Sequence, residues 1–355
     1  MQNPLMRLHR VLWLSAAVTL GGCGEVDVGG GEADNLASSP QALGAQEQVA
    51  AGERHTLRLG TGGTVWASGN NAVGQLGDGT NLDRANPVQV SGLSNVVNIA
   101  AGAHHSLALR ADNVVWAWGF NTYSQIGDGT TTHRHAPVPV FAPAVGVAAG
   151  YLHSLALRSN GTVWTWGQNR PITQVAGLTQ VSDIAAGEDF SLALRANGTV
   201  WTWLTSATTA TQVPGLTQVT AIAAGRRHSL ALRANGTVWT WNAVQPPTQV
   251  PGLSGGVSIA GGEGYSLATD ADGYVWGWGS NSCGQLGDGT TTDRPTPIRA
   301  TGPEFAVSIA GGWRHSIART FDGTHWTWGC NDWGQLGDGL SNTVRYVSVH
   351  GVVHA

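Results

Sequence analysis

Five histidines recur at one position of a repeated phrase, and imidazole is the side chain best suited to binding metal ions or transferring protons near neutral pH. In each copy a glycine and two variable residues precede the histidine, and Ser or Thr follows it. The five are His55, His105, His153, His228 and His315. A zinc site would require three or four such ligands at about 2 Å from one ion.

Two other copies of the phrase carry Phe190 and Tyr265 at the histidine position. A position that accepts His, Phe and Tyr favours a flat, partly buried ring with one hydrogen bond, and separate repeats would hold the imidazoles too far apart for one metal ion. The adjacent serines are poor candidate nucleophiles, because neighbours along a strand point to opposite faces. We therefore assign no catalytic residue, no metal and no cofactor, and expect a protein that is not an enzyme.

A second phrase, Gln-Leu/Ile-Gly-Asp-Gly, occurs four times, and an arginine follows each aspartate by six or seven residues. A calcium loop would need several oxygen ligands at close alternating spacing, whereas each phrase supplies one carboxylate. Asp-Gly favours a turn, so a contact between Asp and Arg that braces the loop is the preferred interpretation. The pairs are Asp78 with Arg84, Asp128 with Arg134, Asp288 with Arg294, and Asp338 with Arg345.

Three cysteines complete the reactive residues. Cys283 and Cys330 lie in corresponding segments of the last two repeats, and the sequence leaves two alternatives open, a disulfide or two free thiols.

Cys23 follows a basic start, an apolar run from Val11 to Leu20 and two glycines. Leu-Gly-Gly-Cys resembles the lipobox of bacterial lipoproteins, which implies lipidation of Cys23; an ordinary signal peptide is the alternative. We expect a signal peptide at 1–22, the lipidated cysteine with a flexible tether at 23–46, and a folded domain at 47–355.

The elements that position these residues follow from an internal repeat. Seven glycines open the units at spacings of 37 to 50 residues, and 13 of the 16 tryptophans fall in a later Val-Trp-x-Trp phrase of each unit. In the third unit, period-two alternation predicts strands at 145–149, 153–158, 162–166 and 172–175. Asn160-Gly161 between two of these predicts a type I′ hairpin. Units with four strands that hide their edges by radial repetition predict an all-β, seven-bladed β-propeller.

The recurring AAG-x-x-HSLAL, G-x-V-W-x-WG-x-N and GQLGDGT phrases resemble the repeat of the RCC1 (regulator of chromosome condensation) superfamily, over residues 48 to 350. The resemblance implies a ring closed by one blade that combines strands from both chain ends, here the segments 48–51 and 345–350. It also implies that the turn between the first two strands can bind proteins, as in a secreted β-lactamase inhibitor of the superfamily. Nucleotide exchange on a small GTPase, the activity of the founding member, is disfavoured, because the N-terminus indicates export.

The two positions between the glycine and the histidine vary most, although the residues around them barely change. Turn tips without restraint would also vary, but Trp, Tyr and Arg are typical of interfaces. The candidate partner-binding residues are Glu53, Arg54, His104, Tyr151, Leu152, Glu188, Asp189, Arg226, Arg227, Glu263, Trp313 and Arg314.

Charge and composition set the remaining expectations. Only 11% of residues are charged, the formal net charge is −4 and all 18 basic residues are arginines, so no nucleic-acid partner is indicated. We expect a monomeric binding platform that is lipid-anchored in a bacterial envelope, at the outer membrane or cell surface, with an unknown protein partner. The alternatives are a secreted or periplasmic hydrolase inhibitor and, less favoured, a propeller enzyme with its active site at the channel mouth.

Overall fold

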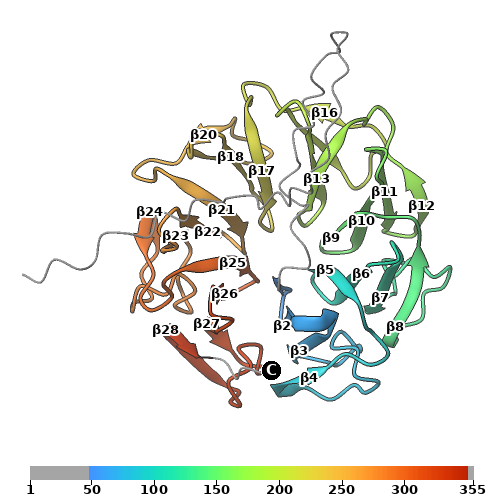
Figure 1. Ribbon diagram of the computed structural model, residues 1–355, viewed down its shortest axis with the longest axis horizontal. Helices are drawn as coiled ribbons and strands as arrows, with labels where there is room; N and C mark the ends of the chain where they lie inside the picture. Colours follow the sequence, from blue (N-terminus) through green and yellow to red (C-terminus); the bar gives the residue numbers. More distant parts are fainter. Residues whose placement is uncertain (1–47, 351–355) are drawn as a thin grey trace, which may run out of the picture. The chain divides into compact units, whose positions relative to one another are not determined.

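The computed structural model describes residues 48–350 as a ring of seven four-stranded antiparallel sheets, the blades (Figure 1). The leader, Cys23, the tether and residues 351–355 lie outside the described residues. In blades 1 to 4 the strands are β1(Val49–Ala51), β2(His55–Leu59), β3(Val65–Gly69), β4(Arg84–Gln89); β5(Val96–Ala101), β6(His105–Arg110), β7(Val115–Gly119), β8(Arg134–Phe141); β9(Gly146–Ala149), β10(His153–Leu157), β11(Val163–Gly167), β12(Arg170–Gln174); β13(Val181–Ala186), β14(Phe190–Arg195), β15(Val200–Leu204) and β16(Thr211–Gln212). In blades 5 to 7 they are β17(Val219–Ala224), β18(Ser229–Arg233), β19(Val238–Trp241), β20(Thr248–Gln249); β21(Gly256–Gly261), β22(Tyr265–Asp270), β23(Val275–Gly279), β24(Arg294–Arg299); β25(Ala306–Gly311), β26(His315–Thr320), β27(His325–Asn331) and β28(Thr343–His350).

The only helical element in this part of the chain is a short 3-10 turn, η1(Thr61–Gly63). Within residues 48–350, no helix has the length and apolar character needed to cross a membrane.

Each blade is one uninterrupted stretch of chain, with its strands paired in sequence order. The first strand of every blade lies beside the first strands of both neighbours, so these seven strands surround the axis. The predicted closure of the ring by a blade of mixed origin is therefore wrong. Strand β1 pairs with β2 in blade 1, and β28 pairs with β27 in blade 7.

Backbone hydrogen bonds between neighbouring blades close the ring instead. The amide of Glu53 in blade 1 donates to the carbonyl of Ala103 in blade 2 at 3.3 Å, and the series ends where Trp313 of blade 7 donates to Gly52 of blade 1 at 3.2 Å. The five intermediate bonds run from Ala103 to Gly150, Tyr151 to Gly187, Glu188 to Arg226, Arg226 to Gly262 and Glu263 to Gly312. Blades 7 and 1 are thus joined like any other pair, and Figure 1 shows them side by side.

The cores lie between blades and follow from alternation along the strands. In blade 2, Leu107 and Leu109 present a bulky face, which packs on Ala156 and Trp166 of blade 3. The small face of the second strand is where the tryptophans fit, because Ala156 pairs with Trp164 in register. The six interfaces from blade 1 to blade 7 bury aliphatic side chains against alanine and tryptophan, and this hydrophobic burial stabilises the ring one interface at a time.

The hairpins between second and third strands differ from the predicted type I′ geometry. Gly161 has φ of +74°, but Asn160 is not among the residues with positive φ. The Gly161 amide donates to the Arg158 carbonyl at 2.9 Å, and the Asn160 side chain accepts from the Thr162 amide at 3.2 Å. This is a type I turn followed by a left-handed glycine, because the asparagine is stabilised by its own side-chain contacts and only the glycine needs positive φ.

Candidate functional site

The two variable positions of each unit lie together at one mouth of the central channel, in the turn that joins the first two strands. The first residue of each pair lines a cavity of about 160 Å³ at this mouth. Its amide belongs to the ring of hydrogen bonds that joins the blades. Backbone contacts of this kind place no demand on side-chain type, so the backbone is fixed while the side chains are free to differ.

Arg226 of blade 5 extends across the mouth and contacts four other blades. Its Nη2 donates to Glu188 at 2.8 Å, and its Nη1 donates to Glu263. The guanidinium carbon also lies 5.8 Å from the Tyr151 ring centroid and 4.7 Å from that of Trp313, which are cation–π distances. Arg226 therefore holds blades 3, 4, 6 and 7 together at the mouth.

These contacts shift the titration of the residues at the mouth. Hydrogen bonding to Glu188 raises the pKa of Arg226 above its usual range. Burial alone would raise the pKa of Glu188, but hydrogen bonds from Arg226 and Arg227 outweigh it and hold the pKa below its ordinary value. Burial raises the pKa of Tyr151. The mouth therefore keeps fixed carboxylate and guanidinium charges across the neutral range.

The opposite side of the mouth is built around Glu53, whose side chain is buried. Arg54 Nε and His104 Nε2 each lie 3.2 Å from a carboxylate oxygen of Glu53. The Arg54 guanidinium also lies 5.9 Å from the Trp313 ring centroid and 5.3 Å from that of Trp333. Sequence reasoning missed Trp333, which stands in the Gly-Asp-Gly loop of blade 7 where the other three loops carry Val73, Tyr123 or Cys283.

The remaining candidates point outward from the mouth. Asp189, Arg227 and Arg314 are exposed, and Leu152 is half-buried. Arg227 donates through Nε to Glu188 at 2.6 Å while its side chain stays 77% exposed. Arg314 lies 3.7 Å from Glu263. The structure thus gathers all twelve predicted partner-binding residues on one face, with paired charges inside and exposed arginines, each beside a glutamate, at the rim.

The repeated histidines lie between blades and away from the mouth. His55 Nε2 lies 3.0 Å from Ser106 Oγ in the next blade, and Ser106 in turn donates to the Gln75 carbonyl. The serine proton is used there, so the imidazole donates through Nε2. The corresponding pairs are His105 with Ser154, His153 with Ser191, His228 with Ser266 and His315 with Thr56.

Burial lowers the pKa of His55, His105 and His315 to about 3, and that of His153 and His228 to about 4. The glycine before each ring leaves room for it, since a Cβ on Gly102 would lie 2.4 Å from His105 Cε1. These imidazoles are neutral parts of the blade interfaces.

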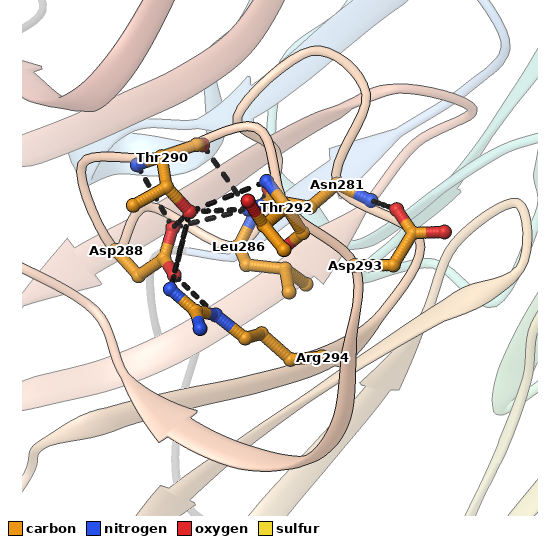
Figure 2. A network of polar contacts seen from close by, with 7 residues as sticks. All are labelled: Asn281, Leu286, Asp288, Thr290, Thr292, Asp293 and Arg294. Atoms are coloured by element: carbon orange, nitrogen blue, oxygen red, sulfur yellow. Dashed lines mark hydrogen bonds and ion pairs between the residues drawn. The ribbon is translucent and has the colours of Figure 1, made fainter.

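The Gly-Asp-Gly loops are organised by the aspartate and by an asparagine seven residues before it (Figure 2). In blade 6, Asn281 donates to Asp288 at 3.0 Å and accepts from the Leu286 amide at 3.0 Å. Asp288 accepts from the Thr290 amide at 3.0 Å and from Arg294 Nε at 2.7 Å. Burial alone would raise the pKa of Asp288, but the Thr290 and Arg294 hydrogen bonds outweigh it and lower the pKa.

The other three loops repeat this arrangement. Arginine Nε lies within hydrogen-bond distance of the aspartate in the pairs Arg84–Asp78 at 3.0 Å, Arg134–Asp128 at 2.6 Å and Arg345–Asp338 at 3.1 Å. Each aspartate accepts from protein donors of its own loop. The asparagine is the organising residue that sequence reasoning missed, although its fixed spacing before the aspartate is visible in the sequence.

Cys283 and Cys330 form a disulfide between blades 6 and 7, with Cα atoms 5.2 Å apart. The structure therefore selects one of the two alternatives that the sequence left open.

Family models for the regulator of chromosome condensation (RCC1) repeat match every blade, one at residues 62–109 and 272–319 and another at 47–75, 96–125, 144–170, 181–203, 219–241, 257–285 and 306–335. No curated protein matches the chain.

Many solved structures match the chain, and three of them show the shared fold. Prp20p from Saccharomyces cerevisiae has a TM-score of 0.73 at 22% identity, over 80% of this chain and 85% of that one. Yeast RCC1 (Prp20) bound to Kap60 has a TM-score of 0.75 at 20% identity, over 94% and 91%. Human WBSCR16 has a TM-score of 0.69 at 24% identity, over 78% and 87%. With repeat matches in all seven blades, the chain belongs to the regulator of chromosome condensation (RCC1) repeat family.

Proposed function

We propose that the chain is a non-catalytic protein-binding platform, tethered through a lipid on Cys23 to a bacterial envelope. The observation that carries the proposal is the separation of roles at the channel mouth. Backbone hydrogen bonds hold all seven turns in place, while the side chains they present differ in every blade. A rigid surface with variable, charged and aromatic groups loses little conformational entropy when it binds a partner.

The chemistry of the mouth favours a protein as the ligand. Tyr151 and Trp313 flank Arg226 at cation–π distance, and residues of these three types dominate the energetics of protein interfaces. Among the structural relatives, Prp20p was studied for its binding to Gsp1p and histones, and yeast RCC1 was solved bound to Kap60. The cavity of about 160 Å³ is small beside the ~300–1,000 Å³ of small-molecule sites.

The test is affinity capture from the native envelope and culture fluid, with the chain from Gln46 onward as bait. The test variant combines Tyr151→Ala, Arg226→Ala, Arg227→Ala and Trp313→Ala. A matched control removes similar side chains from positions away from the mouth, three of them exposed and Arg170 half-buried: Tyr346→Ala, Arg170→Ala, Arg299→Ala and Phe321→Ala.

A protein held by the wild type and the control, but lost by the test variant, would support the proposal. If that protein is a hydrolase whose activity falls on binding, the platform is an inhibitor. Equal capture by all three baits would contradict a role for the mouth. Globomycin-sensitive labelling of Cys23 by a fatty-acid analogue tests the lipid anchor separately, and the absence of label would remove it.

A further inference from the structure

Three gaps between blades are filled by a loop of the preceding blade that hydrogen-bonds to the second tryptophan of the next. In the gap between blades 1 and 2, the carbonyl of Gln75 accepts from Trp118 Nε1 at 2.9 Å and from Ser106 Oγ at 2.9 Å. Gln125 and Gln285 do the same for Trp166 with Ser154 and for Trp328 with Ser316. These three tryptophans are at most 1% exposed.

The loop also supplies an aliphatic side chain and a glycine. Leu76, which follows Gln75, is fully buried, as are its counterparts in the other loops. A Cβ on Gly77 would lie 2.7 Å from Trp118 Nε1, so only glycine lets the loop lie this close to the indole. We call the second tryptophan of a blade, together with the neighbouring serine, the seat of that blade. Each of these three seats takes a carbonyl oxygen, an aliphatic group and a glycine from a Gln-Leu/Ile-Gly turn.

Blades 3, 4 and 5 lack this loop, so within the described residues no Gln-Leu/Ile-Gly turn reaches the seats on blades 4, 5 and 6, although apolar residues of the preceding blade still pack on their tryptophans. Their tryptophans, Trp203, Trp241 and Trp278, are 4%, 8% and 8% exposed. Within residues 48–347, Trp203 Nε1 is buried without a hydrogen-bond partner, and neither Trp241 Nε1 nor Ser229 Oγ has one. The Trp203 indole N–H is buried, and a buried donor without an acceptor is costly. Trp241 Nε1 and Ser229 Oγ are open to solvent, where an incoming carbonyl can reach them.

The seats on blades 4 and 5 open into one groove on the face of the channel mouth. A cavity of about 1000 Å³ runs over the seats of blades 4 and 5 and is lined by Phe190, Trp203, Leu204, Ser229, Trp241 and Val244. Leu204 is 54% exposed and Val244 is 91% exposed, so the groove presents apolar side chains to an occupant. A smaller cavity of about 450 Å³ adjoins Trp278 on blade 6.

We propose that this groove is a docking site for a Gln-aliphatic-Gly turn of a partner protein, which takes the place that the chain's own loops occupy elsewhere. The partner's glutamine carbonyl accepts from Trp241 Nε1 and Ser229 Oγ on blade 5, or from Trp203 Nε1 on blade 4, and its aliphatic side chain packs between the blades. The occupied seats of the same molecule are the template for this contact. The groove borders the channel mouth and shares Tyr151, Glu188 and Arg227 with it, whereas Trp313 and Arg314 belong to the mouth alone.

The test titrates a cyclised peptide with the sequence of residues 74–80, GQLGDGT, into ¹⁵N-labelled chain from Gln46 onward. The ring is closed by hydrogen bonds within residues 48–350, so this fragment contains all seven blades. We expect saturable shifts of the indole N–H signals of Trp203 and Trp241 and none for Trp118, whose seat is filled. A peptide with aspartate in place of leucine should leave all three unchanged.

Substitutions separate the groove from the mouth. Leu204→Glu with Val244→Glu should weaken peptide binding about tenfold or more, and Trp241→Phe, which keeps the ring but loses the donor, about tenfold. Leu82→Glu with Phe321→Glu, two exposed apolar positions outside the groove, should leave it unchanged, as should Trp313→Ala with Arg314→Ala at the mouth. Absence of a saturable shift at both indoles, or equal shifts with the aspartate peptide, would overturn the proposal. So would self-association that Leu204→Glu abolishes, because the occupant would then be a second copy.

Discussion

The glycine that opens each unit is determined by the aromatic ring three residues later. A Cβ on Gly102 would lie 2.4 Å from His105 Cε1 and 2.5 Å from the Gly150 carbonyl oxygen of the next blade. We expect Gly102→Ala to lower the free energy of unfolding by more than about 2 kcal/mol, because the blades must separate to admit the methyl group. Gly92→Ala is the control, since its φ is +70° but no atom lies within 4 Å; there only the backbone conformation costs about 1 kcal/mol. Equal losses in chemical denaturation would contradict the overlap.

The loop aspartate should matter as a buried charge. Asp288 is 3% exposed and accepts from Asn281, Thr290 and Arg294. We expect Asp288→Asn to cost about 1–3 kcal/mol, because the amide cannot accept all of these bonds and leaves buried donors without partners. Arg299→Ala, which breaks an ion pair with exposed Glu304, should cost less than about 0.5 kcal/mol. Thermal unfolding monitored by tryptophan fluorescence compares the two, and similar midpoints would show that the loop is not braced by the aspartate.

Blade 1 lacks the second tryptophan of the repeat, and an arginine side chain fills its place. Where other blades carry Ala and Trp, blade 1 carries Arg58 and Ser68. Arg58 is buried and donates to the Leu336 carbonyl at 2.8 Å, and a Cβ on Gly337 would lie 2.6 Å from its Nη2. The guanidinium thus takes the place of the missing indole, and burial lowers its pKa to about 10. The sequence contains both departures from the repeat, but only their contact explains them.

Among the strands and loops, the repeated strands were predictable from the sequence. The closure of the ring and the geometry of the hairpin turns were not. Period-two alternation placed the four strands of blade 3 to within two residues at each end. The shared strand at ring closure was wrong because a resemblance supplied it, whereas the hydrogen bonds that join blades 7 and 1 are backbone contacts without a sequence signal. The predicted type I′ geometry of the Asn-Gly turns was wrong, because hydrogen bonds to the asparagine side chain stabilise a different turn.

The sequence was enough to predict which residues form the candidate site, but not which of them contact one another. The variable turn residues stood out against a constant framework, which placed all twelve candidates on one face. That Arg226 would join four blades could not be inferred, because the direction of a long side chain over a channel depends on the whole ring.

The disulfide ties two neighbouring blades through their loops. Cys283 and Cys330 are 47 residues apart, and a cross-link of that length lowers the entropy of the unfolded chain. We expect Cys283→Ser with Cys330→Ser to lower the free energy of unfolding by about 2–4 kcal/mol in oxidised protein. Under reducing conditions the wild type and the variant should be equally stable. Two reactive thiols in the unreduced native chain from Gln46 onward would contradict the bond.

For the whole molecule, the buried histidines predict sensitivity to mild acid. In the folded state their pKa values are about 3 to 4, whereas an unfolded histidine titrates near 6.5. Between these values the unfolded chain binds more protons, so stability falls as the pH drops from about 6.5 to 4, by up to ~1.4 kcal/mol per pH unit for each histidine. His325, whose pKa burial also lowers to about 3, adds to the effect. Asp183 acts in the opposite direction, since burial raises its pKa to about 6, but it is one group against six.

Replacement of one histidine by the ring that blade 4 uses should reduce this slope. His228→Phe imitates Phe190. In this variant, the slope of the unfolding free energy against pH between 6 and 4.5 should be smaller by up to ~1.4 kcal/mol per pH unit, the contribution of one histidine. Urea titrations at several pH values measure it. An unchanged slope would mean that His228 is already protonated in the folded ring.

Because every blade is encoded by one unbroken stretch, a genetic joint between units leaves all sheets whole. The phrase QVxGLTQV at 174–181 and 212–219 recurs one unit apart, so a joint between its two copies would leave the phrase intact. An exchange at such a joint would replace a whole blade together with its turn residues and its seat, and the backbone bonds to its neighbours would re-form without regard to side chains. The binding surface of this molecule can therefore evolve by the exchange of whole blades.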